Sequence, residues 1–235
     1  MPPESEYPLQ SLTATRVVVV AGKGGVGKST VAATMAYGLS RAGCKVGLMD
    51  ADVYGPSLPL LMGVHGRPQA TEKQVKPLEA FGVKVMSMGF FLTDDSPVIW
   101  RGPLVFSAVR QFLKDVQWED LDYLVVDMPP GTGDAQLTLV QQVPLAGVLM
   151  VTTPQEVALE DVRRAVRMFE TVNVPVLGIV ENMKRGDSPA VIDLAAEFDV
   201  PFLASLDFDP DLESALGDIN RLRSTAVYRG LESIV

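Results

Sequence analysis

The segment GKGGVGKST, residues 22–30, directly follows the apolar run RVVVVA at 16–21. It matches the pattern G-x-x-x-x-G-K-[ST] of a phosphate-binding loop, which requires a strand before it and a helix after it. In such a loop the glycines let backbone N–H groups point at phosphate oxygens, and the first turn of the helix adds its positive dipole end. The segment therefore predicts a nucleotide site at a strand-to-helix turn.

Two lysines lie in this loop, and the pattern accounts for only one of them. We expect Lys28 to reach the β- and γ-phosphates and the Ser29 hydroxyl to ligate Mg²⁺. Lys23 is either a solvated loop lysine or a side chain that leaves its own site and neutralises the phosphates of a second protomer, as an arginine finger does. The residues expected to contact the nucleotide here are Gly22, Lys23, Gly24, Gly25, Val26, Gly27, Lys28, Ser29 and Thr30.

Apolar, β-branched runs alternate with helical stretches along the rest of the chain. The runs are continuous, which is typical of parallel strands covered on both faces. We therefore predict an α/β fold of the P-loop NTPase type, a doubly wound and mostly parallel sheet with helices on both faces. We also expect a flexible N-terminal arm over 1–15 and one domain over 16–235. The expected strands are 16–21, 45–50, 83–88, 123–128, 147–153, 174–182 and 200–206, and the expected helices are 28–42, 101–116, 134–142, 156–172, 188–199 and about 210–220.

Three aspartates follow expected strands, where carboxylates suit a metal better than a core. Asp127 takes the position of the carboxylate that ligates Mg²⁺ in P-loop proteins, and Asp50 is placed to hold a Mg²⁺-bound water. Asp52 is placed to position or deprotonate the attacking water. The alternative for each is a turn or helix-capping aspartate. Gly131, in PPGTG, is expected to bring its N–H to the γ-phosphate.

The composition of the chain argues against some classes of function. Lys and Arg number 20 against 29 Asp and Glu, and the net charge of −9 argues against general nucleic-acid binding. We expect a cytoplasmic protein, because the N-terminus lacks the pattern of a signal peptide and no apolar run has the length of a membrane span. The single cysteine, Cys44, excludes an intramolecular disulfide and is expected to be a small buried residue.

Six motifs in order, GKGGVGKST, DADVYGPSLP, PVIWRGP, DYLVVDMPPGTGDAQLTL, VTTPQEVALEDVRRAVRMF and VPVLGIVENM, resemble the Mrp/ApbC family. This family belongs to the deviant-Walker-A P-loop ATPases, with MinD and ParA. The resemblance implies a slow ATPase that works as a homodimer, in which Lys23 crosses to the partner's ATP. It also implies switch roles for 50–57 and 127–134 and adenine recognition near Asn182.

The resemblance further implies that the dimer binds a [4Fe–4S] cluster and transfers it to apoprotein acceptors. In the family, the cluster ligands form a CxxC after the ENM segment. Here ENM is followed by KRGDSPAVIDLAAEF, which contains no cysteine and is shorter than its counterpart.

Two other functions remain open from the sequence. A MinD/ParA-type positioning ATPase would use a basic amphipathic tail on a membrane, but 218–235 has an irregular apolar face and favours a helix packed on the domain. A nucleotide-switched interaction protein would use ATP only to lock a dimer. PVIWRGP and VTTPQEVALEDV favour the cluster carrier over the positioning ATPase, and the missing CxxC favours the switched protein.

Overall fold

The structure is a computed structural model. It describes residues 12, 15–52, 55–71, 74–91, 102–130, 137, 139 and 142–232, without the side chains of 102–106 and 219. The expected helix over 134–142 and the arm over 1–15 fall largely or entirely outside these residues.

The described part of the chain contains an eight-stranded sheet with the order β10-β9-β8-β1-β7-β2-β6-β5. Its pairs are parallel except for β5 and β6, which run antiparallel. This confirms the predicted mostly parallel α/β sheet. The strands are β1 (Arg16–Ala21), β2 (Val46–Asp50), β5 (Leu78–Ala80), β6 (Val83–Ser87), β7 (Tyr123–Asp127), β8 (Leu145–Thr152), β9 (Val176–Lys184) and β10 (Phe202–Asp207).

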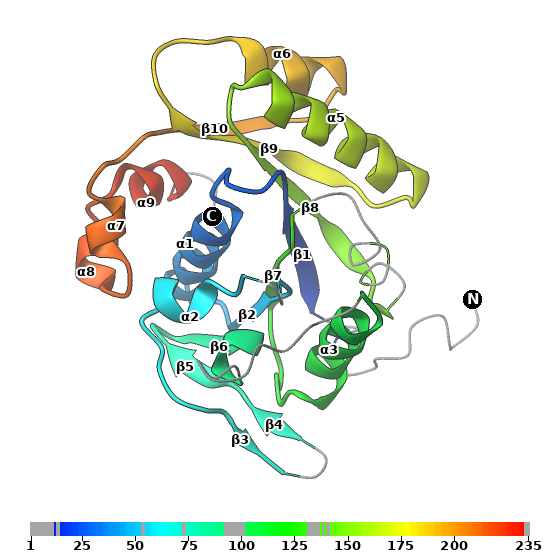
Figure 1. Cartoon of the computed structure of the whole chain (residues 1–235), viewed down its shortest axis with the longest axis vertical. Helices are drawn as coiled ribbons and strands as arrows, with labels where there is room; N and C mark the ends of the chain where they lie inside the picture. Colours follow the sequence, from blue (N-terminus) through cyan, green and yellow to red (C-terminus); the bar gives the residue numbers. More distant parts are fainter. Residues whose placement is uncertain are drawn as a thin grey trace.

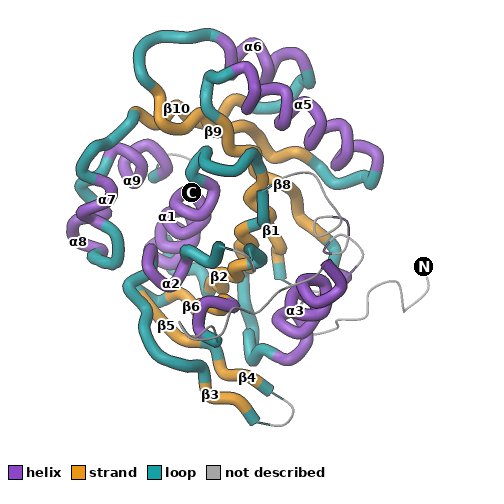
Figure 2. Tube along the Cα trace, viewed as in Figure 1, coloured by secondary structure: helices purple, strands orange, loops and turns teal. Residues whose placement is uncertain are grey.

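Helices cover both faces of this sheet. Figure 1 shows α1 and α9 on one face and α3 and α5 on the other, and Figure 2 shows the same layers by type of structure. The helices are α1 (Lys28–Arg41), α2 (Leu58–Leu61), α3 (Gly102–Asp115), α5 (Glu156–Thr171), α6 (Ala190–Glu197), α7 (Leu212–Ala215), α8 (Ile219–Leu222) and α9 (Ala226–Leu231), with a 3₁₀ turn, η2 (Met88–Phe90).

Several short elements differ from the prediction. No helix or strand is expected from the sequence over 51–82. The structure places α2 there, together with the hairpin of β3 (Gln69–Ala70) and β4 (Val75–Lys76) and the edge strand β5. These strands have two or three residues, too few for a hydrophobic period to identify them. The helix expected near 210–220 divides into α7 and α8. The tail packs on the fold as predicted, since Val227 and Leu231 of α9 are buried in the core.

The register of the sheet places the polar strand ends together. Val20 of β1 pairs with Asp127 of β7, and Asp127 pairs on its other side with Asp50 of β2. Asp50 in turn pairs with Ser87 of β6. Because these strands are parallel, their carboxyl ends lie at one edge, which is also where β1 continues into the glycine loop.

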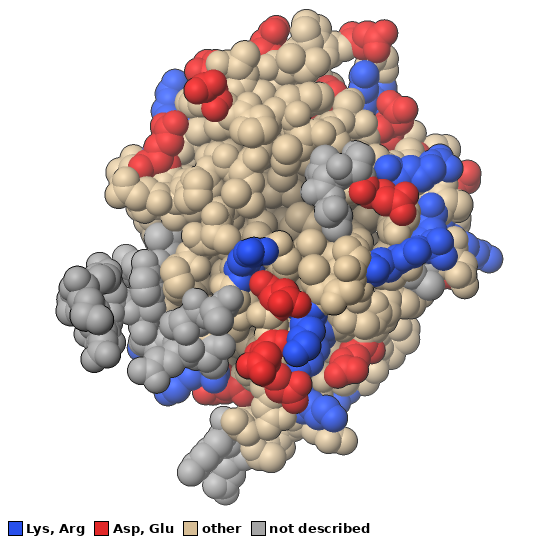
Figure 3. Space-filling view, turned by 180° about the vertical axis from the view of Figure 1, so that it is seen from behind, with Lys and Arg blue, Asp and Glu red and all other residues tan. Residues whose placement is uncertain are grey.

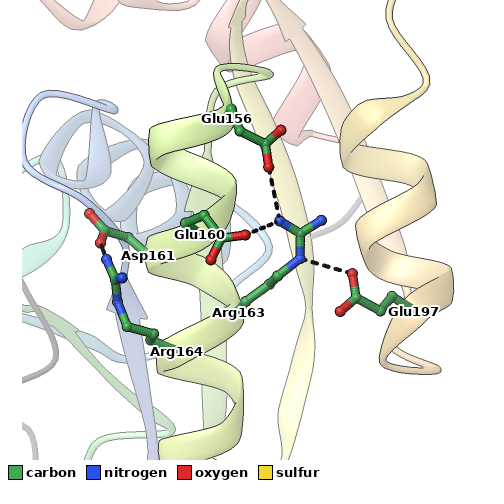
Figure 4. A network of polar contacts seen from close by, with 6 residues as sticks. All are labelled: Glu156, Glu160, Asp161, Arg163, Arg164 and Glu197. Carbon is green, nitrogen blue, oxygen red and sulfur yellow. Dashed lines mark hydrogen bonds and ion pairs between the residues drawn. The ribbon is translucent and has the colours of Figure 1, made fainter.

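Charged side chains also cover the outside of these layers. On the face seen in Figure 3, acidic and basic side chains are interspersed. On α5, Arg163 forms ion pairs with Glu156, Glu160 and, across to α6, Glu197 (Figure 4). Exposed pairs of this kind contribute little to stability because water and salt screen them.

Helix α5 therefore offers a direct comparison of core packing with surface ion pairs. Phe169 on α5 is fully buried. We expect Phe169→Ala to lower the free energy of unfolding by about 3–5 kcal/mol, because it removes buried surface and leaves a cavity. We expect Arg163→Ala, on the same helix, to lower it by no more than about 1 kcal/mol. Urea unfolding of both variants measures this, and equal losses would contradict it.

Candidate functional site

The loop between β1 and α1 has a backbone shape that depends on glycine. Gly22 has φ 153°, and a Cβ there would lie 2.1 Å from the Val151 carbonyl oxygen. Gly27 has φ 85°, and a Cβ there would lie 2.3 Å from the Asn182 amide nitrogen. A side chain at either position is therefore excluded by close contacts as well as by backbone strain. The loop leans over the end of β8 toward β9.

Lys28 opens α1 and turns its side chain back into the loop. It is only 7% exposed, and its Nζ donates a hydrogen bond to the Lys23 carbonyl oxygen at 3.1 Å. Burial lowers the pKa of this ammonium group, while the charges of Asp127 and Asp52 raise it. The loop therefore holds a desolvated cation beside the carboxylates of the strand ends, as a phosphate site requires.

Lys23 lies at the mouth of the loop, and its side chain is about one-third exposed. Its Nζ is 3.8 Å from an Asp161 carboxylate oxygen on α5. Asp161 also pairs with Arg164, as Figure 4 shows. The second lysine of the loop is thus directed to the surface of α5, away from the position of Lys28.

Asp127 ends β7 directly below the loop and is buried. Neither of its carboxylate oxygens meets a donor at hydrogen-bonding geometry among the described residues. Burial raises its pKa to about 7, although the Ser29 hydroxyl and the charge of Lys28 oppose that rise. A buried carboxylate with unpaired oxygens beside a serine hydroxyl fits a hard cation, which would satisfy both oxygens and favour the charged form.

A cation here would need ligands from outside the chain as well. Within the described residues, no group of three or more His, Cys, Asp or Glu side chains is arranged to hold a metal ion. Mg²⁺ is commonly held by one or two protein oxygens together with waters and nucleotide phosphates. Ser29 and Asp127 fit that mode of binding.

Asp50 has a different environment from Asp127. One of its carboxylate oxygens accepts from Asp52 N at 3.1 Å, and the other accepts from Leu58 N at 3.3 Å and from the Ser87 hydroxyl at 3.0 Å. Burial and the charge of Asp127 raise its pKa to about 7, against these hydrogen bonds. From the sequence, Asp50 is expected to hold a Mg²⁺-bound water. The structure gives this carboxylate a second task, which is to fasten the chain between β2 and α2.

Asp52 lies in that connection and is half-buried. Its carboxylate accepts a hydrogen bond from Gly55 N at 3.2 Å, and its charge acts on both Lys28 and Asp127. The structure thus brings Asp52 to the same edge as the loop. Gly131 lies outside the described residues, but the neighbouring Pro130 packs against Gly24, 3.3 Å from the position of a Cβ there.

Asn182, near the end of β9, is 2% exposed. Its amide nitrogen donates to the Val26 carbonyl oxygen at 2.9 Å, and its amide oxygen has no hydrogen-bond partner among the described residues. The sequence analysis placed this residue near a nucleobase. The structure adds a direct contact with the phosphate loop.

A cavity of about 470 Å³ opens beside the loop. The sequence predicts the residues of the glycine loop that line one side of this cavity. It does not predict the opposite side, which is formed by the connection from β8 to α5, by α5 and by residues at the ends of β9 and β10. On that wall Arg185 stacks on the Phe208 ring, with the guanidinium carbon 3.8 Å from the ring centre. The missed residues are Thr153, Pro154, Gln155, Val157, Ala158, Met183, Arg185 and Phe208.

Cys44 does not join this site. It is half-buried in the connection between α1 and β2, beside a surface groove that Lys45 and Glu119 also line. The expectation of a small buried residue is met in part, because this cysteine packs against the core but precedes the fully buried residues of β2. The position is at the amino end of β2, opposite to Asp50.

Comparisons with known proteins identify relatives of this chain by sequence and by fold. A family model described as ParA, NUBPL iron-transfer P-loop NTPase, matches residues 13–227. An iron-sulfur cluster carrier protein of Aquifex aeolicus is 47% identical over 83% of this chain, and one of Pseudomonas fragi is 56% identical over 71%. The matches cover 58% and 59% of those relatives, so this chain spans less than two thirds of their length.

Solved structures give the same fold. A nucleotide-binding protein of Archaeoglobus fulgidus, solved in complex with ADP, is 38% identical with a TM-score of 0.75, covering 90% of this chain and 88% of that one. MinD of Pyrococcus horikoshii, solved with Mg-ADP, has a TM-score of 0.69 at 19% identity, covering 94% of both chains, and shows the likeness of fold alone.

The raised pKa of Asp127 predicts a measurable pH dependence of stability. An aspartate in the unfolded chain has a pKa of about 3.9, whereas burial raises the pKa of folded Asp127 to about 7. The folded chain thus binds more protons between these values, and its stability falls as pH rises through that window. We expect Asp127→Asn, without added metal, to be about 1–3 kcal/mol more stable than the wild type at pH 8 and nearly equal at pH 4.

Urea unfolding across this pH range is the measurement. Asp187→Asn, which removes a fully exposed carboxylate, is the matched control and should follow the wild type throughout. An advantage of Asp127→Asn that stays constant with pH would contradict the burial of an ionisable carboxylate at this position.

Proposed function

This chain belongs to the NUBPL-type, ParA-related family of iron-transfer P-loop NTPases, and from that premise we propose that it binds and hydrolyses ATP as a homodimer acting in iron–sulfur cluster transfer. The observation that carries the nucleotide part is the burial of Lys28, at the start of α1, together with Asp127, at the end of β7. A desolvated ammonium and a carboxylate with unpaired oxygens are costly to bury unless a charged ligand joins them. Mg²⁺ and a nucleoside triphosphate are such ligands.

Each residue of the site then has a part. The loop amides and Lys28 bind the phosphates, and Ser29 and Asp127 would hold Mg²⁺, which when bound neutralises phosphate charge. Asp50 fastens the loop that follows β2 and, through it, positions Asp52. Asp52 orients or deprotonates the water that attacks the γ-phosphate. Thr30 and Gly131 complete the contacts to the nucleotide.

The homodimer rests on Lys23. This side chain stands at the mouth of the loop rather than inside it, and its ion pair with Asp161 is long at 3.8 Å and partly exposed. Such a pair contributes little energy, so a bound nucleotide on a second copy competes for the lysine at small cost. A cation delivered in this way stabilises the charge that develops during phosphoryl transfer.

The iron–sulfur part rests on family membership and on the names of the relatives. Clusters are normally held by cysteine thiolates, commonly four of them, whereas this chain has only Cys44. A dimer would offer two copies, at the edge of the sheet opposite to the nucleotide. The chain's own residues therefore do not fit a cluster bound in the family manner. Cluster transfer would need thiolates from an acceptor apoprotein or from another chain.

The second candidate is a nucleotide-switched interaction protein that uses ATP to lock a dimer and carries no cluster. The single cysteine is the observation that favours it. A positioning ATPase has weaker support, because α9 packs its apolar side chains into the core. In addition, none of the helices that the structure describes has the length and apolar character needed to cross a bilayer.

Lys28 and Lys23 should separate binding from assembly. We expect Lys28→Ala to weaken ATP binding at least tenfold, because it removes the buried cation of the phosphate site. We expect Lys23→Ala to bind ATP within about threefold of the wild type but to lose ATP-dependent dimerisation and turnover. Calorimetry, size-exclusion chromatography with light scattering and phosphate release measure the three properties.

Lys114→Ala provides the control, since it removes an exposed lysine beside the groove around Trp118. It should match the wild type in all three assays. ATP-dependent dimers of Lys23→Ala would rule out the role of Lys23 in the partner's site.

Reconstitution distinguishes the two candidate functions. The chain is incubated with iron and sulfide under anaerobic conditions, with and without an apo-ferredoxin as acceptor. A carrier gives thiolate-to-iron absorption and an ATP-dependent gain of cluster on the ferredoxin. A switched protein stays colourless and does not alter the acceptor, while its ATP-dependent dimer is retained. The latter result would remove cluster transfer from the proposal and leave the nucleotide site standing.

A further inference from the structure

One contact joins the phosphate loop to a strand far away in the sequence. Asn182 and Val26 are 156 positions apart, and their hydrogen bond is buried. In the sheet, β8 lies between β1 and β9, so Asn182 reaches the loop across the end of a whole strand (Figure 1). Gly27 packs against the same amide, which leaves no space for a Cβ. Asn182 therefore contacts the phosphate loop at both Val26 and Gly27.

This hydrogen bond fixes the direction of a phosphate-binding group. A peptide unit is planar and trans, so its C=O and the next N–H point in opposite directions. When the Val26 carbonyl is held toward Asn182, the N–H of Gly27 must point away from Asn182. A second carbonyl, that of Lys23, is held by the ammonium group of Lys28. Two side chains thus set the peptide orientations at both ends of the loop.

We propose that Asn182 is a positioning residue, which holds the loop in its phosphate-binding shape before any nucleotide arrives. The proposal rests on the proposed function, since it assigns Asn182 to the phosphate part of the same site. One N–H of its amide group is committed to Val26, and among the described residues its amide oxygen has no hydrogen-bond partner. Asn182 therefore serves the phosphates through the loop, whether or not it also meets the base.

The test uses tripolyphosphate, which has the phosphates of ATP but no base. We expect Asn182→Ala to weaken tripolyphosphate binding by roughly five- to tenfold, as the loss of one hydrogen bond implies, and to weaken ATP binding by at least the same factor. A residue that contacts only the base would weaken ATP and leave tripolyphosphate unchanged. Calorimetric titration, with displacement of a fluorescent ATP analogue as a second assay, measures both affinities.

Two further variants serve as a second test of Asn182 and as a control. Asn182→Thr has nearly the same volume as the wild type, and its hydroxyl ends short of Val26, so it should behave like Asn182→Ala even if the smaller residue impairs folding. Thr15→Val is the matched control, because it removes a buried side-chain bond to a carbonyl, that of Leu121 at 3.1 Å, at the amino end of β1. It should lower the melting temperature but leave both affinities unchanged.

The outcomes separate the two proposals. A loss of tripolyphosphate affinity in the Asn182 variants, with an equal or larger loss for ATP, supports the positioning role. A loss for ATP alone, no loss for either ligand, or failure of tripolyphosphate to displace the analogue from wild-type protein overturns it while leaving ATP binding intact. A wild-type chain that binds neither ATP nor tripolyphosphate instead overturns the proposed function itself.

Discussion

The burial of β1 between β7 and β8 is the constraint on which the rest of the site depends. Hydrogen bonds on both sides of β1 fix the height at which the strand ends, and that height places the glycine loop over Asp127 on one side and Val151 on the other. A shift of one residue in this register would turn Asp127 to the other face of the sheet. The apolar run that precedes the loop is thus as much a part of the nucleotide site as the loop itself.

The same pairing of strands places two buried carboxylates, those of Asp127 and Asp50, next to each other. Asp127 and Asp50 are register partners at adjacent strand ends, both are buried, and the pKa of each is raised to about 7. The two carboxylates differ in how their oxygens are used. Those of Asp50 are engaged by Ser87 and by the backbone that leads to α2, whereas those of Asp127 meet no donor at hydrogen-bonding geometry among the described residues. In the proposed function a ligand completes the region beside Lys28, while Asp50 holds a loop.

Much of this site follows from local sequence, and the remainder follows from contacts that sequence order hides. The loop of 22–30 and the end of β7 could be predicted because each pairs an apolar strand with a polar residue at its carboxyl end. Ser87 obeys the same rule and could have been found by it. The Asn182–Val26 contact could not, because it depends on which strand lies two places from β1. The strand β5 was missed because three residues carry no periodicity.

The position of Cys44 bears on how any cargo would be coupled to the nucleotide. Cys44 and Asp50 are six positions apart, and a strand rises about 3.3 Å per residue, so the cysteine lies up to about 20 Å from the carboxyl end of β2. Over that distance, which exceeds the screening length of physiological salt, about 8 Å, interactions between solvent-exposed charges are largely screened. Coupling between the two would have to run through packed elements that shift. Asp50 with its partners Ser87 and Leu58, and Pro130 packed on Gly24, lie at the end of the sheet that carries the phosphate loop, opposite to Cys44. The geometry thus favours surfaces near the phosphate loop, rather than the lone thiol, as the part of this chain that reports the nucleotide state to a partner.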